Sequence, residues 1–148
     1  MKKLLPPILF ILTAAMMGLA CWATSSEHNI PYPYNLAGLF FLVVGLGMAS
    51  WGSRLFRRLG TNIMTFGEPN MLVTEGLYQF TRNPMYLGFV IAVFGMAILY
   101  QGAMIAFAVA FLFFVVTDRW YIKFEERVML DKFGEEYQSY CNQTRRWI

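Results

Sequence analysis

The chain has 148 residues, of which 57% are hydrophobic and only 14% are charged, and its formal net charge is +3. Soluble domains carry about 25% charged residues, so this composition excludes an ordinary soluble enzyme and indicates an integral membrane protein. The sequence contains no CxxC, HExxH or glycine-rich phosphate loop, and Cys21 and Cys141 lie too far apart to suggest a metal site. These absences argue against zinc hydrolysis, phosphoryl transfer and dinucleotide-dependent hydride transfer. The small positive charge does not require a nucleic-acid partner.

Four apolar stretches without a charged residue occur along the chain, at residues 4–23, 36–51, 85–100 and 102–117. A membrane-spanning helix needs ~20 apolar residues, so the last three stretches span a bilayer only if flanking residues extend them or the bilayer thins locally. The connection at residues 100–102 is too short for a long loop and predicts a tight helical hairpin. We therefore expect an all-α polytopic membrane protein, with residues 1–148 forming a single domain of four transmembrane helices.

The first apolar stretch also resembles a secretory signal, because Lys2 and Lys3 precede an apolar core that leads to Cys21. A lipoprotein cleavage site favours leucine three residues before the cysteine, where this chain has Gly18. We therefore expect the first helix to be retained.

Basic residues fall on one side of the predicted spans. The connection between the first two spans contains Glu27 and His28 but no Lys or Arg, and the turn at residues 100–102 has no charge. All 12 Lys and Arg residues thus lie on the opposite side, which the positive-inside rule assigns to the cytoplasm. We expect both termini to be cytoplasmic in a bacterial inner membrane.

Residues 118–133 contain no helix breaker, so the fourth helix is expected to continue out of the membrane for about four turns until Gly134 ends it. This extension carries Glu125 and Glu126. An ion pair with Lys123 would explain Glu126 as a solvated helix residue. Adjacent helical residues point about 100° apart, so at most one of the two glutamates faces a site squarely.

The segment EGLYQFTRNPMYLG, residues 75–88, leads from polar sequence into the third apolar stretch. Pro84 suits the first turn of a helix, and Thr81 or Asn83 is a candidate N-cap. Helix N-termini attract anions, and Arg82 adds a full positive charge at the same place. The simplest interpretation is a membrane anchor at Arg82 and a cap at Asn83. The alternative is a binding site at the membrane surface.

Two motifs, LVTEGLYQFTRNPMYLG and EERVMLDKFGEEYQSY, occur in this order and resemble the isoprenylcysteine carboxyl methyltransferase and phospholipid methyltransferase superfamily. The resemblance covers roughly residues 70–146. It implies an integral membrane enzyme that transfers a methyl group from S-adenosyl-methionine to a lipid-like acceptor, such as the carboxylate of an isoprenylcysteine, at the cytoplasmic face. A phospholipid amine and a small thiol are alternative acceptors. A non-catalytic helical module that binds lipid or a partner protein is the alternative from another class.

The resemblance also implies site residues. The expected cofactor contacts are Met71, Leu72, Val73, Tyr78, Asn83, Pro84, Met85, Tyr86 and Glu125. The candidate catalytic residues are Arg82, Glu126 and Arg119, and no metal is expected. The sequence departs from the family at two positions: Asn83 stands where many carboxyl methyltransferases have histidine, and the family's substrate-contacting arginine falls on Tyr121. These departures indicate that the acceptor can differ from a prenylated cysteine.

Overall fold

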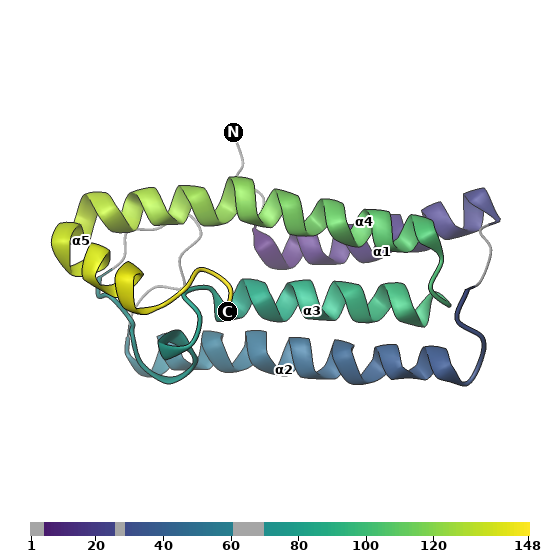
Figure 1. Ribbon diagram of the computed structural model, residues 1–148, viewed down its shortest axis with the longest axis horizontal. Helices are drawn as coiled ribbons and strands as arrows, with labels where there is room; N and C mark the ends of the chain where they lie inside the picture. Colours follow the sequence, from purple (N-terminus) through teal and green to yellow (C-terminus); the bar gives the residue numbers. More distant parts are fainter. Residues whose placement is uncertain (1–4, 26–28, 61–69) are drawn as a thin grey trace.

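The computed structural model describes residues 5–25, 29–60 and 70–148, and all regular structure within these ranges is helical. The longer helices are α1 (Pro6–Thr24), α2 (Ala37–Arg58), α3 (Pro84–Leu99), α4 (Met104–Val116) and α5 (Lys123–Gln143), and the short helical segments are η1 (Tyr34–Leu36), η2 (Gly76–Gln79) and η3 (Thr117–Ile122). Figure 1 shows α1 to α4 side by side along the long axis, with α5 extending α4 beyond this bundle. The predicted all-α polytopic fold is confirmed, while Lys2, Lys3, Glu27 and His28 lie outside the described residues.

Three helical segments are long and apolar enough to cross a membrane: Pro6–Thr24, Tyr34–Arg58 and Met104–Gln143. The fourth predicted span corresponds to α3, which has 16 residues and is therefore ~24 Å long, against ~30 Å for the hydrocarbon core. Each predicted span thus corresponds to one helix, although α3 alone is shorter than the core. The hairpin predicted at residues 100–102 is present, with Gln101 at φ 57° and Gly102 at φ 66°.

The helix that begins with α4 continues through η3 into the first segment of α5, over residues 104–133. A helix of these 30 residues is ~45 Å long, about one and a half times the hydrocarbon thickness, so the polar part from Asp118 onward extends beyond the bilayer. The predicted continuation is confirmed, but η3 is a π-helical turn that the sequence did not predict. Such wide turns often occur at functional sites because they re-aim the residues that follow.

Gly134 interrupts α5, as its φ of 50° and ψ of −119° lie outside the helical region. The predicted end of the helix at this glycine is therefore correct for the first segment only, since a second helical segment continues to Gln143. Figure 1 shows this second segment turning back toward α2 and α3. The reversal brings the last residues of the chain over the start of α3.

Close contact between α2 and α3 depends on glycine. A Cβ atom on Gly45 would lie 2.4 Å from the carbonyl oxygen of Gly88, and one on Gly88 would lie 2.5 Å from the carbonyl oxygen of Gly45. Gly38 and Gly95 form a second reciprocal pair of the same kind. Small residues allow helix backbones to touch in membranes, where the lipid provides no hydrophobic drive for association. This contact fixes the end of α2 beside the start of α3.

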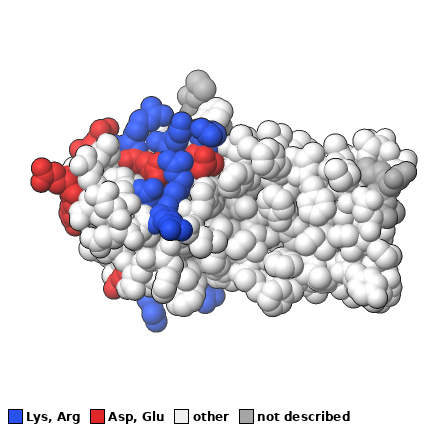
Figure 2. Space-filling view, in the orientation of Figure 1, with Lys and Arg blue, Asp and Glu red and all other residues white. Residues whose placement is uncertain are grey.

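Charged side chains gather at the end of the molecule where α5 lies, and the rest of the visible face carries none (Figure 2). This one-sided distribution agrees with the predicted clustering of basic residues for the part of the chain that the structure describes. The assignment of this charged end to the cytoplasm stays a prediction.

Candidate active site

A cavity lies at the charged end of the bundle, between the end of α2, the segment before α3 and α5. We call it the inner chamber. Its lining residues are Phe56, Met71, Leu72, Val73, Tyr78, Arg82, Asn83, Met85, Tyr86, Glu125, Glu126, Met129, Tyr137 and Tyr140. The volume open to the centres of water molecules is about 70 Å³. Since one water needs ~10–15 Å³ of such volume, the chamber has room for about five waters.

The inner chamber brings together every residue that the sequence proposed for cofactor binding except Pro84, which begins α3. It also contains four residues that were not predicted from the sequence: Phe56, Met129, Tyr137 and Tyr140. Met129 lies one helical turn after Glu125, so helical periodicity was an available signal. Tyr137 and Tyr140 reach the chamber only because the chain reverses at Gly134.

A wider cleft adjoins the inner chamber and opens to solvent, with a corresponding volume of about 510 Å³. We call it the outer cleft. It is lined by Arg82, Lys123, Glu126, Arg127, Leu130, Tyr137, Gln138, Cys141 and Arg146. Arg82, Glu126 and Tyr137 line both spaces and therefore form the partition between them.

Glu125 is the acidic group deepest in the inner chamber. The hydroxyl of Tyr86 donates a hydrogen bond to its Oε1 atom at 2.6 Å. Burial disfavours the charged form more strongly than this hydrogen bond favours it, so the pKa of Glu125 is raised from 4.5 to about 8. At neutral pH the carboxyl group is therefore mostly protonated.

Two buried donors in the inner chamber lack hydrogen-bond acceptors among the described residues. One is the hydroxyl of Tyr78, a residue that is only 5% exposed, and the other is Nε of Arg82. Burial, and then the nearby Glu125, raise the pKa of Tyr78, so its hydroxyl stays protonated. An unsatisfied buried donor costs about 1–3 kcal/mol, and such groups in a cavity indicate a position where a ligand supplies the acceptor.

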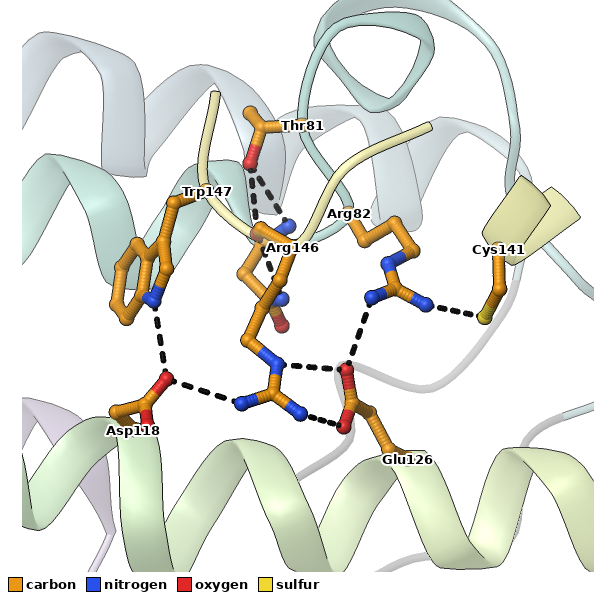
Figure 3. A network of polar contacts seen from close by, with 8 residues as sticks. Thr81, Arg82, Asp118, Glu126, Cys141, Arg146 and Trp147 are labelled. Atoms are coloured by element: carbon orange, nitrogen blue, oxygen red, sulfur yellow. Dashed lines mark hydrogen bonds and ion pairs between the residues drawn. The ribbon is translucent and has the colours of Figure 1, made fainter. Parts of the chain in front are cut away.

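Glu126 joins two arginines at the partition (Figure 3). Its Oε1 atom lies 3.3 Å from Nη2 of Arg82, and its Oε2 atom lies 2.5 Å from Nη2 of Arg146. Nε of Arg146 also donates to Oε1 at 3.0 Å, so Arg146 binds this carboxylate in a bidentate manner. Arg82 in turn donates to the sulfur of Cys141. Glu126 therefore pairs with two arginines on other segments of the chain. The ion pair between Glu126 and Lys123 that the sequence suggested is not formed.

Residues 144–147 form a strap that crosses the start of α3. The backbone carbonyl of Arg146 accepts hydrogen bonds from Oγ1 of Thr81 at 3.1 Å and from Nδ2 of Asn83 at 3.0 Å. Asn83 occupies the N-cap position of α3, as predicted, but its side chain makes no capping hydrogen bond to this helix, and Oγ1 of Thr81 accepts a hydrogen bond from the backbone N–H of Asn83 at 3.2 Å. The side chains of Arg146 and Trp147 both donate to Oδ1 of Asp118, at 3.3 and 3.0 Å.

Arg119 lies apart from the other two candidate catalytic residues. Its side chain is 71% exposed and pairs with Asp118 at 3.4 Å. It lines a groove with Trp120 on the outer face of the long helix. It lines neither the inner chamber nor the outer cleft. The structure thus brings Arg82 and Glu126 together and leaves Arg119 outside. Within residues 5–25, 29–60 and 70–148, no group of three or more His, Cys, Asp or Glu residues is arranged to hold a metal ion.

Two curated proteins share sequence with this chain. It is 36% identical over 72 residues to methanethiol S-methyltransferase 1 of Bradyrhizobium diazoefficiens, a match that covers 49% of this chain and 24% of that protein. It is 35% identical over 80 residues to protein-S-isoprenylcysteine O-methyltransferase B of Arabidopsis thaliana, covering 52% of this chain and 39% of that protein. The chain thus spans well under half the length of these curated relatives. No solved structure matches it.

The sequence model of one family, described as phospholipid methyltransferase, matches residues 34–136. This range begins with η1 and ends in the second segment of α5, so it contains the lining of the inner chamber apart from Tyr137 and Tyr140. The match extends over more than half of the sequence, and the chain therefore belongs to the phospholipid methyltransferase family.

Proposed function

We propose that this protein transfers a methyl group from S-adenosyl-methionine to an amphiphilic acceptor at the membrane surface. The observation that carries the proposal is the inner chamber, where aromatic rings, a buried carboxyl group and two donors that have no acceptor among the described residues line one cavity at the polar end of a membrane bundle. Membership of the phospholipid methyltransferase family supports the same reaction class.

The residues of the inner chamber fit such a methyl donor. A carboxylate or ribose hydroxyl of the donor would satisfy Tyr78 and Arg82 Nε, which have no acceptor among the described residues. Glu125 would bind an amino or hydroxyl group, and the faces of Phe56 and Tyr86 would attract a sulfonium cation. The bound donor supplies an electrophilic methyl group on a positively charged sulfur.

The inner chamber must widen for this ligand, because its open volume of about 70 Å³ holds only a few waters. Three methionines in its lining, Met71, Met85 and Met129, have flexible side chains that can repack around a bound molecule. We expect donor binding to displace them. Closure of the chamber afterwards would exclude water from the reacting atoms.

In this reaction the protein aligns the acceptor atom with the methyl carbon. The acceptor's lone pair forms the new bond to carbon while the carbon–sulfur bond breaks and its electrons stay on sulfur. A carboxylate acceptor has no proton to lose, so it requires no base, whereas a thiol or an amine must release one proton. Arg82 and Glu126, at the partition, are the groups positioned to contact the acceptor.

The acceptor that we favour is the carboxylate of an isoprenylcysteine-type lipid, with a small thiol as the second candidate. Each choice has the support of one relative, since the names of the two curated relatives include isoprenylcysteine and methanethiol. The open cleft beside the apolar bundle favours an acceptor that has both a polar head and an apolar chain. We place this cleft on the cytoplasmic face of an inner membrane by the positive-inside rule.

Replacement of Tyr78 by Phe tests the donor site. The change removes a buried hydroxyl that lacks an acceptor in the unliganded protein, so Tyr78→Phe should unfold at the same temperature as the parent or at a higher one. Its affinity for S-adenosyl-homocysteine, measured by calorimetric titration, should nevertheless fall by roughly 3- to 10-fold because one hydrogen bond to the ligand is lost.

The matched control is Tyr34→Phe, which removes the same hydroxyl from a residue that is 73% exposed and begins η1, before the start of α2, whereas the chamber lies at the end of α2. It should leave both the unfolding temperature and the affinity unchanged. Parental affinity in Tyr78→Phe would argue against a donor in the inner chamber. Absence of any binding by the folded parent would overturn the proposed function.

A further inference from the structure

The outer cleft carries an excess of positive charge. Arg146 is neutralised by Asp118 and Glu126, and Arg82 also pairs with Glu126. The remaining two cations of its lining are Lys123 and Arg127 on α5, and neither has a carboxylate partner among the described residues. Four cations therefore face two carboxylates, which leaves a net charge of about +2 in a cleft of about 510 Å³.

Lys123 and Arg127 are four residues apart and thus adjacent on one face of α5. Nε of Arg127 donates to the backbone carbonyl of Lys123 at 3.3 Å, which holds the guanidinium beside the lysine. Two like charges at this spacing destabilise an isolated helix by a few tenths of a kcal/mol. An anion bound between them would remove this repulsion and would gain two charge-assisted contacts.

The same cleft has apolar surface beside its cations. Leu130 is 40% exposed and lies one turn further along α5 from Arg127, and the ring of Tyr137 forms part of the partition. Lys123 lies seven residues past Val116, the last residue of α4, or ~10 Å along the helix. These residues therefore lie on the polar side of the apolar segment, where head groups and not hydrocarbon chains are found.

We infer that Lys123 and Arg127 form a subsite for an anionic group of the methyl acceptor, either the carboxylate oxygen that does not receive the methyl group or the phosphate of a lipid head group. This inference rests on the proposed function and deepens it, because it names the chemistry that selects the acceptor. An acceptor held there by its anion has its reactive atom directed past Arg82 and Glu126 into the inner chamber. A neutral thiol gains nothing from the subsite.

The test compares acceptors with and without an anionic group. The first pair is 2-mercaptohexadecanoic acid and its neutral amide, which share the thiol and the chain, and only methylation of sulfur is scored for this pair because the carboxylate of the acid can itself accept a methyl group. Phosphatidylethanolamine vesicles provide the phosphate arm. Transfer of tritium-labelled methyl groups from S-adenosyl-methionine to each acceptor is measured for the parent, for the double variant K123Q/R127Q and for K132Q. The last is the matched control, because Lys132 lies on α5 outside the cleft lining.

The expected result is a rise in KM of roughly 5- to 30-fold in K123Q/R127Q for one or both anionic acceptors, with no change for the amide. The arm that responds identifies the anion as carboxylate or phosphate. In the parent, KM for that acceptor should increase with salt concentration, and this dependence should weaken in the double variant. K132Q should behave as the parent.

Calorimetric titration with S-adenosyl-homocysteine separates this inference from the proposed function. The double variant should bind the ligand as tightly as the parent does, which would show an intact inner chamber. Lost binding, an equal loss of transfer to the acid and the amide, or a parental preference for the amide would overturn the subsite. Absence of S-adenosyl-homocysteine binding by the folded parent would overturn the proposed function, and the inference with it, whereas transfer to none of the three acceptors by a parent that binds this ligand would overturn the subsite alone.

Discussion

Replacement of Glu125 by Gln should abolish a pH dependence of donor binding that the parent protein shows. The folded protein holds this carboxyl group with a pKa of about 8, because burial outweighs the hydrogen bond from Tyr86. If the ionised carboxylate binds the amino group of the donor, only the ionised fraction of the protein binds tightly. That fraction is ~1% at pH 6 and about half at pH 8.

The affinity of the parent for S-adenosyl-homocysteine should therefore rise by roughly 10- to 50-fold from pH 6 to pH 8, limited by the 1.5–3 kcal/mol that a charge-assisted hydrogen bond contributes. Glu125→Gln resembles the protonated acid in size and hydrogen bonding, so it should match the parent at pH 6 and should stay weak at pH 8. Tyr78, Tyr137 and Tyr140 do not contribute to this change, since burial raises the pKa of each of them.

Calorimetric titrations at pH 6, 7 and 8 provide the measurement, and Glu135→Gln is the control because this exposed glutamate lies on α5 away from the chamber. It should keep the parental profile. A parental affinity that does not change with pH, or a parental profile in Glu125→Gln, would refute the assignment of the carboxylate to the donor. The stability of the ligand-free protein should change with pH in the opposite direction to the donor affinity. The folded state retains the Glu125 proton above the reference pKa of 4.5, so the contribution of this group to folding stability is present at low pH and is lost as the pH rises through about 8.

Three further predictions concern the scaffold. Gly45→Ala should destabilise the protein by about 1–3 kcal/mol in unfolding experiments in detergent, because the new Cβ atom would lie 2.4 Å from a carbonyl oxygen of α3. Gly47→Ala is the control on the same helix and should have little effect, because a Cβ atom there would meet nothing within 4 Å. Equal effects of the two substitutions would contradict the close packing of α2 and α3. Arg146→Lys should cost about 1–2 kcal/mol, since lysine cannot reproduce the bidentate contact with Glu126, and an unchanged unfolding temperature would show that the strap contributes nothing. Reporter fusions should indicate cytoplasm after Arg58 and the other side of the membrane after Asn29, and the reverse result would place the site on the outer face.

The helices of the membrane bundle were predictable because each depends on local sequence. Uncharged stretches located four spans, Pro84 marked the start of α3, and a glycine at positive φ closes the hairpin after residue 100. The π-helical turn η3 was not predictable, since no glycine or proline marks it. The α2 helix runs to Arg58 and not only to Trp51, because three arginines and Leu55 in the segment after Gly52 are good helix formers.

The inner chamber was largely predictable from two motifs, but the contacts around it were not. Arg146 is separated from Thr81 by 65 residues and from Glu126 by 20, so no local pattern indicates that they meet. Gly134 signalled a break in the helix but not the direction of the chain after it. Asn83 stands at the predicted N-cap position, but its side chain does not cap α3, because its amide donates to the carbonyl of a residue that is distant in sequence.

Methyl transfer by the purified protein tests the central claim most directly. The protein is reconstituted in vesicles with tritium-labelled S-adenosyl-methionine and an isoprenylcysteine-type lipid, and both the labelled product and S-adenosyl-homocysteine are quantified. We predict that the two products form in equal amounts, and that the water-soluble head group without its lipid chain is methylated far more slowly. Formation of neither product by protein that remains folded, as judged by its unfolding temperature, would contradict the account.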